Sequence, residues 1–200
     1  MTSAAPRVVS VHDGSEALAQ ALASEAEWLW VLAEGARPRH NALERLVAAI
    51  EPEDAAPATV LAGLLVDEHG EALDDRIQAA PRIDSDAAVR LVGQQLLPIR
   101  SAGFAHCLVA RAAFSRHGLP DVRRFGPFAA QEWTARVLRS EPGYLVPASV
   151  VVLPTLAERA DRGTPLLHLV AAMRMLPTGT WSRGDAACTI WRALAGRHPS

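Results

Sequence analysis

Two neighbouring arginines, Arg123 and Arg124, are of a type and spacing that could bind an anion. Two adjacent guanidinium groups can hold a phosphate or a carboxylate through paired hydrogen bonds, although a solvated arginine pair explains the same residues. The common catalytic motifs are missing from the sequence, which has no HExxH, no GxSxG and, because it has no lysine, no GxxxxGK loop. These absences argue against a zinc protease, a serine hydrolase and a P-loop nucleotide hydrolase.

The composition is typical of a globular protein with a single core. The chain has 200 residues, of which half are hydrophobic and 21% are charged, and this length suits one domain. All 20 basic residues are arginine, which together with abundant alanine indicates high-GC codon usage. The net charge of −2 leaves no basic excess to neutralise phosphates, so the composition argues against a general nucleic-acid binder.

The two cysteines indicate a reducing compartment. Cys107 and Cys188 form no CxxC pair and have no histidine at a spacing that suits zinc, so we expect two buried thiols without a disulfide. The first residues lack a charged region followed by an apolar stretch, and no uncharged run reaches about 18 apolar residues. We therefore expect a cytoplasmic protein, with the inner face of the membrane as a peripheral alternative.

Short apolar runs alternate with helical patterns, which predicts an α/β fold with a mostly parallel sheet. We expect strands at 8–11, 28–32, 59–66, 101–109 and 143–153, the last bent at Pro147, and a hairpin turn at 67–70. Helices are expected at 15–26, 38–50, 111–117 and 129–138, with Pro38 in the first turn of the second. Residues 1–160 would form this domain, and apolar helices at 165–176 and 185–194 would form an extension, 161–200, that packs on it or faces a membrane or partner.

Two blocks of the sequence carry a family resemblance. The first is WLWVLAEGARP at 28–38, followed by a helix with ALERL. The second combines AGFAHCLVAR at 102–111, RHGLPD at 116–121, QEWTAR at 131–136, PGYLVP at 142–147 and VVVLPT at 150–155. With LAGLLVDEHG at 61–70 between them, their order and spacing resemble family 2 glycosyltransferases, especially rhamnosyl- and galactofuranosyl-transferase-like members. The resemblance implies a GT-A-like, three-layer domain that takes a nucleotide sugar as donor.

The first departure from this family concerns the metal. The resemblance implies an acidic cluster after the strand of the first block, where a divalent cation bridges the two phosphates of the donor. Here the stretch reads Ala33-Glu34-Gly35-Ala36, so Glu34 is the one carboxylate available as a ligand. Magnesium and manganese prefer several hard oxygen ligands, so Glu34 is a weak candidate ligand or a solvated turn residue.

The second departure concerns the catalytic base. The paired acids of the family fall on Ala129 and Ala130, whose methyl groups cannot accept a proton. Glu132 stands at a later acidic position and remains as a candidate base, although its spacing also lets it pair with Arg136 at i+4.

The resemblance also indicates where a substrate would bind. Asp13 lies in a turn that resembles a nucleoside site, and Trp133, Arg123 and Arg124 are further candidate substrate contacts. About 27 residues precede Trp28, fewer than such a nucleoside pocket usually takes, so the chain resembles a shortened member of the family.

These departures together predict a degenerate glycosyltransferase, weak or inactive, that acts as a binding or scaffold partner of an active glycosyltransferase in cell-envelope polysaccharide assembly. One alternative is an active inverting transferase with a reduced magnesium or manganese site, using Glu34 near the diphosphate, Glu132 as base and Arg123 or Arg124 as a clamp. The other is a non-enzymatic module that binds a membrane surface or another protein through the C-terminal helices.

Overall fold

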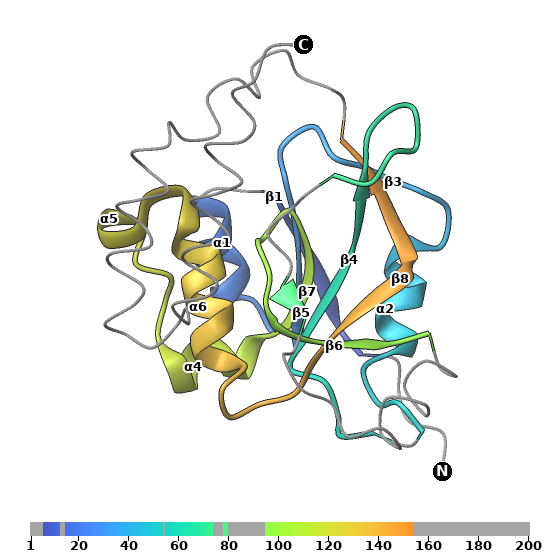
Figure 1. Ribbon diagram of the computed structural model, residues 1–200. Helices are drawn as coiled ribbons and strands as arrows, with labels where there is room; N and C mark the ends of the chain where they lie inside the picture. The colour runs from blue at the N-terminus through green and yellow to red at the C-terminus, as the bar shows by residue number, and fades with distance from the viewer. Residues whose placement is uncertain (1–5, 13–14, 54, 74–77, 80–94, 154–200) are drawn as a thin grey trace.

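The computed structural model describes residues 6–12, 15–53, 55–73, 78–79 and 95–153. Figure 1 shows a central sheet with α2 on one face and with α1, α4 and α6 on the other. The strands are β1 Val8–His12, β2 Trp28–Leu32, β3 Arg37–Pro38, β4 Val60–Val66, β5 Gln78–Ala79, β6 Leu97–Ser101, β7 His106–Ala110 and β8 Gly143–Val152. The helices are α1 Ser15–Ala23, α2 Ala42–Ala48, α4 Arg111–His117, α5 Val122–Phe125 and α6 Ala129–Val137, with a 3₁₀ turn at Gly126–Phe128.

The sheet is mixed, and the prediction of a mostly parallel sheet is wrong. Its order is β1-β2-β7-β4-β8-β6-β5, with β3 paired to β8. Strand pairs β1/β2 and β4/β8 are parallel, whereas β7 runs antiparallel to both β2 and β4, and β3 and β6 run antiparallel to β8. Strands that are covered on both faces have continuous apolar runs in either direction, so their pattern does not reveal polarity.

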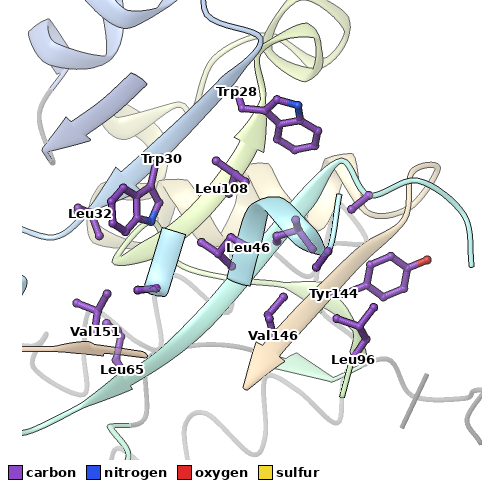
Figure 2. Close-up of a cluster of buried hydrophobic side chains, with 14 residues drawn as sticks. Trp28, Trp30, Leu32, Leu46, Leu65, Leu96, Leu108, Tyr144, Val146 and Val151 are labelled. Atoms are coloured by element: carbon purple, nitrogen blue, oxygen red, sulfur yellow. The ribbon is translucent and has the colours of Figure 1, made fainter. Parts of the chain in front are cut away.

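Both faces of the sheet are buried, as the continuous apolar run of β2 predicts. Its five residues are all buried. Because side chains alternate along a strand, Trp28, Trp30 and Leu32 pack in the cluster that contains Leu46 of α2 (Figure 2), whereas Leu29 and Val31 join the cluster on the opposite face. The sheet and the helices on its two faces therefore form the three layers that the family resemblance implied.

Two of the expected elements differ in the structure. The single strand expected at 101–109 is divided into β6 and β7 by residues 102–105. Pro38 does not begin a helix: it lies in β3 opposite Val151, the backbone N–H of Arg39 donates to the carbonyl of Val150 at 3.0 Å, and α2 begins only at Ala42. Proline suits an edge strand as well as a first helical turn, and pairing with β8 decides between them here.

The bend expected in the last strand is confirmed. Along the β4/β8 pair, Gly63 is opposite Val146 but the next residue, Leu64, is opposite Val150. Residues 147–149 therefore form a bulge in β8, which re-aims the strand where Pro147 was expected to bend it.

Four strands end at one edge of the sheet. β1, β2, β4 and β8 run in the same direction, so their carboxyl ends lie together at what we call the carboxyl edge. Segment 33–41 leaves β2 at this edge and reaches β8 through β3. The turn expected at 67–70 follows β4 there and is confirmed, since Asp67 Oδ1 accepts hydrogen bonds from the backbone N–H groups of His69 at 2.8 Å and Glu71 at 2.9 Å.

Several predictions from the sequence concern residues that the structure does not describe. The extension 161–200, its apolar helices and Cys188 lie outside the described residues, as does the boundary at residue 160. Cys107 is buried as expected, and its thiol donates to the carbonyl of Gly103 at 2.9 Å. Among the described helices, none combines the length and apolar character that crossing a bilayer requires.

Candidate functional site

Glu34 lies at the carboxyl edge, in the turn that follows β2. The turn is closed by a hydrogen bond from the backbone N–H of Ala36 to the carbonyl of Ala33 at 3.1 Å, and Gly35 adopts the left-handed conformation with φ of 72°. The Glu34 side chain is exposed to solvent. The strand-then-acid pattern therefore located this residue correctly in the fold.

The described residues contain no cluster of side chains that could hold a metal ion by itself. No group of three or more histidine, cysteine, aspartate or glutamate side chains among them converges in a way that could hold a metal ion. Glu34 offers one exposed carboxylate, so waters and the donor phosphates would have to supply the other oxygen ligands of a magnesium ion. The other acid placed at the nucleoside site by the sequence, Asp13, lies outside the described residues.

Glu132, the candidate base, is buried and bound to an arginine. Its side chain is 5% exposed, and its two carboxylate oxygens accept hydrogen bonds from Arg136 Nε at 3.3 Å and Nη2 at 3.2 Å. This i,i+4 pair is the structural alternative that the sequence spacing left open. With its carboxylate buried and both oxygens engaged by Arg136, Glu132 is poorly placed to take a proton from an incoming sugar hydroxyl.

Two side chains of α6, Trp133 and Arg136, hydrogen-bond to the backbone of residues 117–119. Arg136 donates to the carbonyls of His117 and Leu119, and Trp133 Nε1 donates to the carbonyl of Gly118 at 2.5 Å. The Trp133 ring is fully buried and stacks on Phe114 with centroids 4.3 Å apart. Trp133 is thus a core residue that anchors three successive carbonyls together with Arg136, and this placement favours a structural role over the substrate contact predicted for it.

Replacing Glu132 with glutamine should lower the free energy of unfolding by about 1–2 kcal/mol, because the half-buried Arg136 guanidinium would lose its buried, charged partner. Urea denaturation would measure this, with Glu44→Gln on the exposed side of α2 as the matched control that should change little. A Glu132→Gln protein of unchanged stability that nevertheless loses a transferase activity would contradict the structural role and restore the catalytic one.

Arg123 and Arg124 lie on α5, away from the strand that carries Arg37. Both are exposed, and the Arg124 guanidinium lies 5.1 Å from the centroid of the Phe125 ring. Figure 1 places α5 beside α6 and places β3 on the far side of the sheet. The structure therefore does not bring this arginine pair together with the segment that carries Glu34.

A buried histidine that sequence reasoning missed holds the elements around the site. His106 is 1% exposed; its Nδ1 accepts a hydrogen bond from Trp30 Nε1 at 3.2 Å, and its Nε2 lies 2.9 Å from Ser149 Oγ. Since the indole N–H can only donate, Nε2 carries the ring proton and donates to Ser149, whose hydroxyl donates to the carbonyl of Ala42 at 2.7 Å. Burial lowers the pKa of His106 to about 4, which keeps the ring neutral.

This chain of hydrogen bonds connects β2, β7, the bulge of β8 and the first turn of α2. It therefore braces both ends of segment 33–41, which runs between β2 and α2. A histidine within the apolar run AHCLVA was the only sequence signal, because its partners Trp30 and Ser149 are 76 and 43 residues away.

Neither a protein-family model nor a curated protein sequence matches the chain. Among solved structures, 70% of the chain aligns with GalNAc-T7 bound to UDP, GalNAc and Mn²⁺, with a TM-score of 0.50 and 16% identity, and this covers 30% of that chain. A second alignment, with residues 1–349 of S. aureus TarS in complex with UDP-GlcNAc, has a TM-score of 0.49 and 11% identity over 90% of this chain and 50% of the other.

The likeness to GalNAc-T7 identifies the fold as that of a GT-A-like glycosyltransferase. The expected fold is confirmed at this level, and the narrower resemblance to family 2 stays a prediction. The chain spans about a third to a half of the length of these structures.

Proposed function

We propose that this protein binds a nucleotide sugar at the carboxyl edge of its GT-A-like sheet and transfers the sugar weakly or not at all. In this role it serves as a binding or scaffold partner of an active glycosyltransferase that assembles a cell-envelope polysaccharide. The GT-A-like fold supports the nucleotide-sugar part of the proposal, since GalNAc-T7 was solved with UDP and GalNAc bound.

The proposed low activity rests on the lack of an available catalytic base on α6. The helix begins with Ala129 and Ala130, and its acid, Glu132, is buried against Arg136. Sugar transfer needs a base that can reach the attacking hydroxyl directly or through one water. A bound cation would neutralise the leaving diphosphate, but Glu34 is the only carboxylate that segment 33–41 offers as its ligand.

Calorimetry with UDP-sugars, GDP-sugars and ADP-sugars, together with a transfer assay on the same donors, tests the proposal. We expect dissociation constants of roughly 10 μM to 1 mM for at least one donor and turnover at least about a thousandfold below an ordinary enzyme rate near 10 s⁻¹. Robust metal-dependent transfer that Glu34→Ala or Glu132→Ala abolishes would overturn the proposed inactivity. Absence of binding at millimolar donor would overturn the proposed ligand.

A further inference from the structure

Segment 33–41 carries two exposed arginines just after the position where the resemblance implies metal-binding acids. Arg37 and Arg39 follow Glu34 by three and five residues, and both are exposed. Neither forms an ion pair with another residue that the structure describes, in contrast to Arg116 and Arg136, which bind Glu141 and Glu132. Two cationic groups that form no ion pair with any described residue therefore lie beside the carboxyl edge.

The backbone holds these two arginines in a defined position. Arg37 lies opposite Val152 of β8, and the N–H of Arg39 donates to the carbonyl of Val150, so the pairing continues through three residues. Because side chains alternate along an extended chain, Arg37 and Arg39 lie on the same side of the segment, with Cα atoms about 7 Å apart. Long guanidinium side chains at that spacing can converge on one small anion.

The Arg39 side chain extends toward the turn that follows β4. Its Nη2 atom is 3.8 Å from the position that a Cβ atom would take at Gly70. Strands β4 and β8 end side by side at the carboxyl edge, so this guanidinium lies over the ends of two neighbouring strands. The acids of this turn form no ion pair with Arg39 among the described residues, and Asp67 Oδ1 is engaged by the backbone N–H groups of His69 and Glu71.

We infer that Arg37 and Arg39 take the place of a divalent cation and bind the diphosphate of the nucleotide sugar directly. This inference rests on the proposed function. Two guanidinium groups carry the same charge as one Mg²⁺ or Mn²⁺ ion, remain protonated at every physiological pH, and bind phosphate oxygens in a bidentate manner. The exchange explains why the segment keeps one acid, Glu34, and gains two bases where the family resemblance implies an acidic cluster.

Calorimetric titration of the full chain with UDP, GDP, ADP and inorganic pyrophosphate tests the inference. The wild-type protein should bind a nucleoside diphosphate equally well, within about twofold, in EDTA and in Mn²⁺. Arg37→Gln and Arg39→Gln should each weaken binding about tenfold, and the double variant about a hundredfold, because each removes a charge-assisted hydrogen bond to phosphate. Arg45→Gln, an exposed arginine of α2 with the same charge change, should bind within twofold of wild type.

The outcomes separate this inference from the proposed function. Binding that EDTA abolishes, or binding that the double variant retains in full with an unchanged melting temperature, overturns the arginine site while nucleotide-sugar binding stands. Pyrophosphate binding that depends on both arginines without any binding of nucleoside diphosphates or nucleotide sugars overturns the proposed function and keeps an anion site. A wild-type protein that binds none of these ligands overturns both.

Discussion

A Gly63→Ala variant is expected to lose about 3 kcal/mol or more of unfolding free energy, an unusually large effect for one added methyl group. An added Cβ would lie 2.1 Å from His106 Nε2 and 2.7 Å from the backbone oxygen of Ser149. The imidazole cannot rotate away without breaking its bonds to Trp30 and Ser149, which are both buried. The added methyl group therefore causes both a steric clash and the loss of buried hydrogen bonds.

A double-mutant cycle with His106 shows whether the imidazole or the Ser149 backbone excludes a side chain at position 63. In a His106→Ala background the ring is gone, so Gly63→Ala should cost about 1–2 kcal/mol less than in wild type. Urea denaturation of the four proteins measures the difference. An equal cost in both backgrounds would mean that the Ser149 backbone, and not the histidine network, makes glycine necessary at position 63.

The sequence predicted the elements whose signal is local. β2 occupies the expected residues 28–32, because five buried apolar residues stand between polar ones, and Arg111–His117 forms the expected helix before Gly118. The bend of β8 was also visible, since a proline within an apolar run interrupts regular pairing. Strand direction and the role of Pro38 were not visible, because both depend on pairing with residues far along the chain.

In the candidate site, too, local features could be predicted from the sequence and long-range contacts could not. Glu34 could be placed from the strand before it, but the sequence could not show that Glu132 is buried against Arg136 or that Trp133 stacks on Phe114. Nothing in the sequence singles out Arg37 and Arg39 among its arginines, because their position depends on the pairing of β3 with β8.

Acid should destabilise the protein between pH 6.5 and about 4 through His106. Burial lowers the pKa of this ring from 6.5 to about 4. Between these two pH values the imidazole is protonated in the unfolded chain and neutral in the folded chain. Stability is therefore complete above pH 6.5 and falls by about 3 kcal/mol as the pH approaches 4, below which the folded form is protonated too. The Trp30 N–H facing Nδ1 gives the geometric reason, since a proton there would confront a second donor.

Glu141 affects a lower pH range and must be separated from this effect. Arg116, then His117 and Thr59, hydrogen-bond to its carboxylate and lower its pKa to about 2, so its contribution is lost only as the pH falls below 4.5. Among the described groups whose pKa shifts, His106 is the one that titrates mainly between pH 7 and 4.5, so urea midpoints over this range report chiefly on it. Compared with wild type, His106→Gln should be less stable at pH 7 but show a much flatter stability curve over this range. Parallel curves would place the titrating group elsewhere and remove His106 as the acid-sensitive brace of segment 33–41.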